Sequence, residues 1–213
     1  MGLENREGGH WITIYDGKFT QRVADGTAGA TQRVNKLGKA VWEKYYDSFV
    51  GKLVNIRTQD SPYGKQWVFD FKDVGDVYHL TLGYANGFAS TFLKILPNVD
   101  VTKEIKVSTN TKEVDGKKKS SLFISQNGVS LKHAYTKETQ NGIPQWEQLV
   151  VKGVQVWDNT KELEFLENMV RTTILPKLEG LPVDTAEQKA QEDFDNYGKP
   201  VPEGEINPDD IPF

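Results

Sequence analysis

The stretch Gln66-Trp67-Val68-Phe69-Asp70-Phe71-Lys72 decides how the chain can fold. Its three aromatic residues recur at every second position, which is the period of a β-strand, so they are predicted to share one face. The turn-forming segments 61–65 and 73–76 flank this strand and connect it to two others. The sequence therefore predicts an antiparallel meander made of segments 40–58, 66–72 and 77–83.

The residues before the meander predict a hairpin and a loop. Residues 10–15 and 18–23 alternate in strand fashion around the turn Asp16-Gly17, which predicts an N-terminal hairpin. The segment 25–39 is rich in glycine, alanine and threonine and is predicted to be a loop. Gly51 marks a predicted bend in the first meander strand.

The residues after the meander indicate the fold class. In the segment 86–96 the apolar side chains recur with helical spacing, and Pro97 follows it. Two more predicted strands, 104–112 and 120–126, flank the turn Asp115-Gly116. Three strands, a helix and two strands is the element order of the OB-fold, a five-stranded barrel. We therefore predict a mainly β protein with helices, built on an OB-fold with an N-terminal hairpin.

The rest of the chain is predicted to add elements to this domain and to end in a tail outside it. The segment 129–157 is predicted to add strands to the barrel, and a helix capped by Asn159 is expected to end at Pro176. Residues 1–183 would form one domain. Residues 184–213 are predicted to be a disordered acidic tail, with a polar helix at its start.

The charge is divided unevenly between these two parts. The formal net charge is −4, but residues 184–213 hold nine acidic residues against two lysines, a net of −7. Residues 1–183 hold 24 basic and 21 acidic residues, a net of +3. This distribution is typical of a protein that holds phosphates with its body and recruits proteins with its tail, although an ordinary domain with a solvated tail would share it.

Several function classes are disfavoured by residues that the sequence lacks. It has no cysteine, and its three histidines have no metal-ligand spacing, so we expect no metal and no cofactor. It has no phosphate-binding loop and no recognisable acid-base pair of carboxylates, so we expect no enzyme. It has neither a signal peptide nor an apolar run of ~20 residues, so we expect a soluble, intracellular protein without a membrane role.

The acidic tail ends in an apolar tip, which consists of Asp209, Asp210, Ile211, Pro212 and Phe213. This tip resembles the C-terminal tip of bacterial single-stranded DNA-binding proteins. The resemblance covers about the last five residues and implies that they bind replication and repair proteins, with the free carboxylate beside the Phe213 ring. The unusual body suggests a divergent, phage-encoded version that would act in the cytoplasm of a bacterial host.

A groove for single-stranded DNA needs cations for phosphates and aromatic faces for bases. In an OB-fold, strands 2 and 3 and the loops 1-2 and 4-5 line that groove. The corresponding candidates, with two cations of the curved first strand, are Lys52, Arg57, Tyr63, Lys65, Trp67, Tyr78, Lys117, Lys118 and Lys119. The loop that carries Arg33, Lys36 and Lys39 is the next candidate.

The predicted function is sequence-independent binding of single-stranded DNA in DNA replication, recombination or repair. The alternative is a β-rich module that binds carbohydrate or protein, because such modules have the same aromatic content.

Overall fold

A computed structural model of the chain describes residues 9–35, 37–136, 141–151 and 153–180. The predicted tail 184–213, with its polar helix and its tip, lies outside these residues, and so does the candidate Lys36. The described part is mainly β, as predicted. No helix in it is long and apolar enough to cross a membrane.

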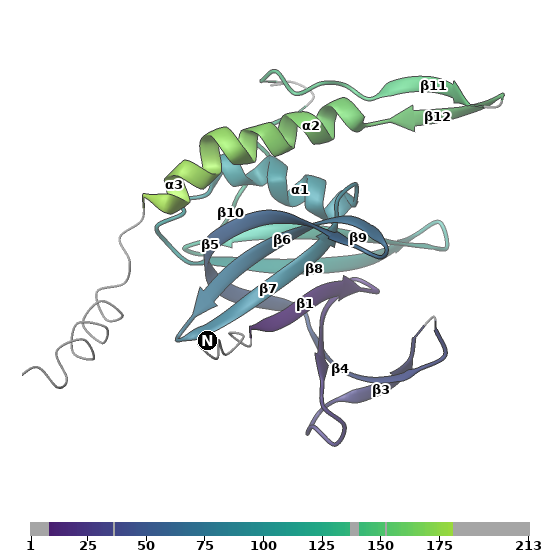
Figure 1. The fold of residues 1–213 in the computed structure, drawn as a ribbon, viewed down its shortest axis with the longest axis vertical. Coiled ribbons are helices and arrows are strands. Elements are labelled where there is room, and N and C mark those ends of the chain that lie inside the picture. Colours follow the sequence, from purple (N-terminus) through teal and green to yellow (C-terminus); the bar gives the residue numbers. More distant parts are fainter. Residues whose placement is uncertain (1–8, 36, 137–140, 152, 181–213) are drawn as a thin grey trace, which may run out of the picture. The chain divides into compact units, whose positions relative to one another are not determined.

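In the described part of the chain, ten strands form one sheet in the order β10-β9-β8-β5-β6-β7-β1-β2-β4-β3 (Figure 1). Neighbouring strands are antiparallel, except that β1 and β7 are parallel. The strands are β1 (His10–Tyr15), β2 (Lys18–Val23), β3 (Thr31–Val34), β4 (Ala40–Tyr46), β5 (Ser48–Ser61), β6 (Gly64–Asp73), β7 (Asp76–Gly83), β8 (Ile105–Val114), β9 (Lys117–Gln126) and β10 (Val129–Ser130).

The helices and a separate hairpin complete the described structure. The helix α1 lies between β7 and β8, and α2 is continued by a π-helical turn, η2, and by α3. The strands β11 and β12 pair only with each other. The bounds are α1 (Gly87–Ile95), η1 (Leu96–Asn98), β11 (Glu147–Val151), β12 (Val154–Asp158), α2 (Thr160–Met169), η2 (Val170–Ile174) and α3 (Leu175–Glu179).

The long strand β5 changes its partner at Gly51, where the sequence predicts a bend. Residues up to Gly51 pair with β8, and residues from Lys52 onward pair with β6. A Cβ atom at Gly51 would lie 3.2 Å from the Cβ atom of Phe71, so a side chain would crowd the neighbouring strand. A register shift between Leu53 and Asn55 adds a bulge just beyond this point.

The elements β5, β6, β7, α1, β8 and β9 follow one another in the predicted order, but barrel closure is not confirmed. In the described part of the chain β7 pairs with β6 and with β1, not with β9. The N-terminal hairpin is therefore part of the main sheet. Its turn returns to β8, because the hydroxyl of Thr109 donates a hydrogen bond of 2.6 Å to the carbonyl of Gly17.

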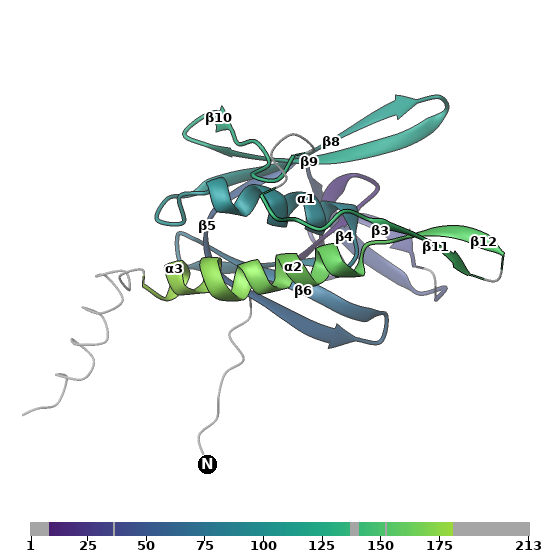
Figure 2. The same ribbon diagram turned by 90° about the horizontal axis from the view of Figure 1, so that it is seen from above.

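The core lies between the inner face of the sheet and α1. The aromatic side chains of β6 at positions 67, 69 and 71 are at most 1% exposed and share this face, as predicted. The ring centroid of Phe92 from α1 lies 4.4 Å from that of Phe69. Both α1 and α2 lie on this side of the sheet (Figure 1 and Figure 2). Asn86 caps α1 by accepting a hydrogen bond of 2.7 Å from the amide of Phe88.

Three predictions about strands need correction. The segment 25–39 is not only a loop, because it contains β3, which pairs with β4. Segment 40–58 is not one strand, because Asp47 separates β4 from β5. In segment 129–157, only the short strand β10 joins the main sheet, while β11 and β12 form their own hairpin.

The ends of the C-terminal helix also differ from the prediction. The side chain of Asn159 makes no capping hydrogen bond, and Asp158 instead accepts one of 3.0 Å from the amide of Thr160. Pro176 does not end the helix but lies within α3. The preceding π-helical turn η2 changes the hydrogen-bond pattern, so the missing N–H group of Pro176 is tolerated there.

Candidate nucleic-acid interface

The strand register divides the side chains of the sheet between two faces. Because successive residues point to opposite sides, the core position of Trp67, Phe69 and Phe71 places their neighbours in β6 on the other side. We call this side the outer face. It carries Asn55, Arg57, Val68, Asp70, His79, Thr81, Trp11, Thr13 and Tyr15 from the adjacent strands β5, β6, β7 and β1.

Asp70 is the centre of the first cluster on the outer face. It is only 6% exposed, and it forms an ion pair with Arg57. Nδ1 of His79 lies 2.6 Å from one carboxylate oxygen, and the amide of Asn55 donates a hydrogen bond of 3.2 Å to the other. Asp70 therefore fixes the orientation of both the Arg57 guanidinium and the His79 ring.

Trp11 offers an exposed ring beside this cluster. Trp11 is paired with His79 in the parallel ladder of β1 and β7. The centroids of the two rings lie 4.6 Å apart, and the angle between the ring planes is 37°. The side chain of Trp11 is nevertheless 48% exposed. One face of its ring is supported from within the protein, and the exposed remainder can stack on a base.

Tyr15 belongs to a second cluster, four residues further along β1 on the same face. The guanidinium carbon of Arg33 lies 4.3 Å from the centre of the Tyr15 ring. The same guanidinium donates two hydrogen bonds, of 2.8 and 2.6 Å, to the carboxylate of Glu43, and the hydroxyl of Tyr45 donates a third, of 2.9 Å. Arg33 is therefore held in place beside a tyrosine ring that is 46% exposed.

The carboxylate of Glu43 stays ionised in this cluster although it is buried. The hydrogen bonds from Arg33 lower its pKa and outweigh the effect of burial, which acts in the opposite direction. A second guanidinium, that of Arg22, lies 3.9 Å from Glu43 and is 67% exposed. Two arginines around one carboxylate leave a net positive charge on this part of the face.

Three of the predicted site residues are on the outer face or at its border. Arg57 lies on the outer face, where Asp70 holds it. Lys52 has the same orientation and is paired across the strands with Lys72 at the far end of β6. Tyr63 lies in the turn between β5 and β6 and is 82% exposed, so its ring is free to contact a ligand.

Three others face different parts of the molecule. Trp67 is 1% exposed and stacks on Tyr84 with a centroid distance of 5.5 Å, so it belongs to the core and has no free face for a base. Nζ of Lys65 lies 2.8 Å from the carboxylate of Glu167 in α2. Tyr78 points to the inner side and lines a cavity there. We leave these three residues out of the interface.

The three predicted lysines of the β8–β9 hairpin all fall in β9. Lys118 pairs with Asp16 at an N–O distance of 2.9 Å, and the hydrogen bond to Asp16 raises its pKa. Lys119 is exposed and lies opposite Lys112. Lys117 is the first residue of β9 and pairs with Val114.

Trp11, Tyr15, Arg22 and His79 are interface candidates that the sequence analysis missed. Strand alternation could have predicted them in part. Once the aromatic triplet of β6 is assigned to the core, every second residue of the adjacent strands must face outward. The missing information was the pairing of β1 with β7, which no local pattern predicts.

In the described part of the chain no group of three histidine, aspartate or glutamate residues could hold a metal ion. Comparison with protein-family models, with curated proteins and with solved structures gave no match. The class that can be assigned is therefore a mainly β protein whose large sheet presents an arginine-rich, aromatic outer face.

Proposed function

We propose that the chain is a sequence-independent single-stranded DNA-binding protein of DNA replication, recombination or repair. The observation that supports this most is the outer face with its two half-exposed aromatic rings. Tyr15 lies against Arg33, which shares Glu43 with Arg22, and Trp11 lies against His79, which shares Asp70 with Arg57. Stacking platforms with adjacent cations are the common elements of sites that bind single strands without reading their sequence.

We further propose that β5, β6, β7, α1, β8 and β9 form an OB-type core. Three features support this assignment: the element order, the pairing of β5 with both β6 and β8, and the bend at Gly51. The β1–β2 hairpin would occupy the gap between the third and fifth strands of such a barrel. The outer face would then correspond to the surface of strands 2 and 3, where OB-folds bind nucleic acid.

In this proposal the two kinds of side chain have separate tasks. Bases stack on Trp11 and Tyr15, and the phosphates contact the exposed edges of the arginines. Asp70 and Glu43 hold Arg57 and Arg33 in position before DNA arrives, so less side-chain entropy is lost on binding. The exposed Tyr63 would extend the stacking surface past the end of the β5–β6 hairpin.

The tip Asp209–Phe213 would recruit replication and repair enzymes. Its two carboxylates, its terminal carboxylate and the Phe213 ring suit a partner pocket that combines an apolar hole with arginine or lysine. The site of action would be the bacterial cytoplasm, where such partners meet DNA.

One titration tests the DNA-binding proposal. Fluorescently labelled oligo(dT) and duplex of the same length are titrated with the protein at several salt concentrations. We expect tighter binding of the single strand and a log-log salt slope of about −0.7 for each phosphate contact. Equal affinity for duplex would contradict the proposal, and binding that is insensitive to salt would favour the carbohydrate-binding alternative.

A further inference from the structure

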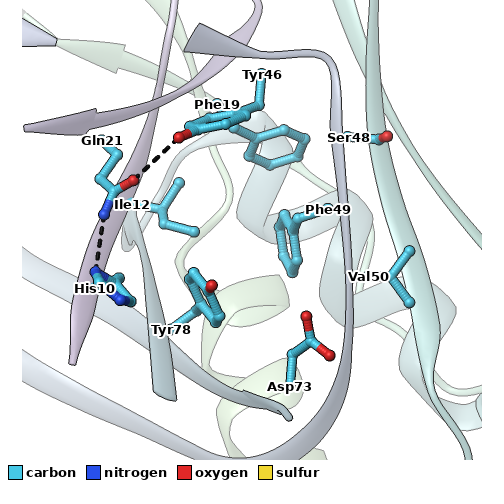
Figure 3. A pocket seen from close by; sticks show the side chains of 10 residues that line it. All are labelled: His10, Ile12, Phe19, Gln21, Tyr46, Ser48, Phe49, Val50, Asp73 and Tyr78. Atoms are coloured by element: carbon cyan, nitrogen blue, oxygen red, sulfur yellow. Dashed lines mark hydrogen bonds between the residues drawn. The ribbon is translucent and has the colours of Figure 1, made fainter. Parts of the chain in front are cut away.

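A cavity of about 290 Å³ opens on the inner side of the sheet, opposite to the outer face (Figure 3). Its walls come from β1, β2, β4, β5, β6 and β7. The lining residues are His10, Ile12, Phe19, Gln21, Tyr46, Ser48, Phe49, Val50, Asp73 and Tyr78. None of the residues proposed above to contact DNA belongs to this set.

Five of the ten lining residues carry an aromatic ring. Phe49 lies between Phe19 and Phe71, with edge-to-face contacts at centroid distances of 5.0 and 4.9 Å. On the other side, the rings of Tyr78 and His10 are 5.0 Å apart. Tyr46 closes the upper rim of the cavity in Figure 3. A ligand inside therefore meets π faces and ring edges from several directions.

The charge in this cavity is negative. The carboxylate of Asp73 points into it beside the hydroxyl of Tyr78 (Figure 3). The ten lining residues include no lysine and no arginine, and Asp73 is the one carboxylate among them. Burial, and then the charges of Asp76 and Asp73, raise the pKa of Tyr78, so its hydroxyl stays neutral.

The polar groups on the opposite wall are already paired with one another. The hydroxyl of Tyr46 donates to Oε1 of Gln21 at 3.3 Å, which leaves Nε2 of Gln21 to donate to Nδ1 of His10 at 2.9 Å. Nδ1 of His10 is thus taken up by Gln21, and its Nε2 lies 3.8 Å from a carboxylate oxygen of Asp76. Asp73 is thus the charged group of the lining that a ligand would have to satisfy.

We propose that this cavity binds an organic cation, either an alkylammonium or a guanidinium group. Aromatic rings attract cations through their negative faces, and a nearby carboxylate strengthens that attraction. The volume lies at the lower end of the range for ligand pockets, so it admits a small cationic group rather than a nucleotide. The carboxylate would also repel a phosphate. The inference stands apart from the proposed DNA-binding function.

A pair of isosteric ligands tests the proposal. Choline and its neutral analogue 3,3-dimethylbutan-1-ol have nearly the same shape and differ in charge. Binding to the full chain is measured by NMR chemical-shift titration. We expect choline to bind at least about tenfold more tightly than the alcohol, because the ring faces and the Asp73 carboxylate attract only the charged ligand. Equal affinities would overturn the proposal.

Variants of single residues test whether choline binds in this cavity. Asp73→Asn should remove most of the preference for choline, whereas Asp60→Asn, at an exposed position of β5, should leave it unchanged. Tyr78→Phe keeps the ring and should retain binding, and Tyr78→Leu should weaken it. Preference for choline that survives Asp73→Asn would place the site elsewhere and refute the assignment.

Putrescine and N-acetyl-arginine methylamide serve as the next probes. Tighter binding of putrescine would indicate a free amine as the natural ligand, and tighter binding of the arginine derivative would indicate a protein side chain. Both results support the cation site, and failure of both to bind would overturn it. Titration of the Asp73→Asn variant with oligo(dT) keeps this result separate from the proposed function, because Asp73 is not on the outer face.

Discussion

At the scale of single residues, two tryptophans show how strand orientation separates core from surface. Trp67 and Trp11 both lie in strands of the main sheet, yet one is 1% exposed and the other 48%. The difference follows from the face to which each points, since α1 covers the inner face and the ring of His79 supports Trp11 on the outer one. Only Trp11 can contribute to binding without leaving its packed position.

Trp11→Ala should weaken binding of oligo(dT) by between about fivefold and about 150-fold, because stacking contributes ~1–3 kcal/mol per base. Fluorescence anisotropy at fixed salt measures this change. Trp157→Ala is the matched control, since Trp157 is 64% exposed but belongs to the separate β11–β12 hairpin. An equal loss in both variants, or in neither, would remove Trp11 from the interface.

Glu43→Gln should lower the free energy of unfolding by about 1–3 kcal/mol at pH 7, because Arg33 and Tyr45 lose their charged acceptor. The pKa of Glu43 is lowered from its ordinary value of 4.5. The folded state therefore favours the ionised form, and this stabilisation is present above pH 4.5 and is lost as the pH falls through the lowered pKa.

The difference between wild type and Glu43→Gln should consequently shrink below about pH 4.5. Urea unfolding at a series of pH values measures it. Glu113→Gln, at an exposed position of the β8–β9 hairpin, is the control and should change stability by less than ~0.5 kcal/mol. A constant difference down to acid pH would show that Glu43 is not ionised in the folded protein.

At the scale of elements, local patterns predict the strands and α1 well but not how the strands are arranged. Alternation identified the β1–β2 hairpin and the core face of β6, and helical spacing identified α1. The parallel pairing of β1 with β7 joins residues 68 positions apart and leaves no local trace. The short strand β3 was missed because its four residues have no buried face to produce alternation.

Gly17→Ala should test the contact of the β1–β2 turn with β8. Gly17 has a φ of +74°, and a Cβ atom there would lie 1.9 Å from the hydroxyl of Thr111. Gly26 has a nearly equal φ of +77° but open space around it. Both changes to alanine should cost about 1–2 kcal/mol for the backbone, and Gly17→Ala about 1–3 kcal/mol more for the clash. Urea unfolding that shows equal losses would argue against the contact.

The candidates in the β5–β6 turn and in the β8–β9 hairpin can be tested together. Tyr63→Ala should weaken oligo(dT) binding without changing the salt slope, because it removes stacking alone. Changing Lys117, Lys118 and Lys119 together to alanine should make the slope shallower by up to about 2, at about 0.7 for each phosphate contact. Full affinity in both variants would place the DNA on the outer face alone.

At the scale of the whole molecule, charge is the property that the sequence alone describes best. The mildly basic residues 1–183 and the acidic residues 184–213 follow from counting. Counting does not reveal which basic groups are free to bind phosphate. Lys65 and Lys118, for example, pair with acidic residues that lie 102 positions away along the chain. Which cations remain for phosphate depends on such long-range pairs, and only the folded chain reveals them.

Removal of Asp209–Phe213 tests the division of tasks between body and tip. We expect oligo(dT) affinity and the unfolding midpoint to stay at the wild-type values, because the proposed interface lies on the outer face. Capture of tip-binding replication and repair enzymes should be lost, and capture by the full chain should weaken as salt rises, since charge-assisted contacts are screened. Trp11→Ala provides the reciprocal control, because it should keep partner capture while losing DNA affinity. A truncated chain that fails to bind oligo(dT), or that unfolds more easily, would show that Phe213 supports the fold rather than a partner contact.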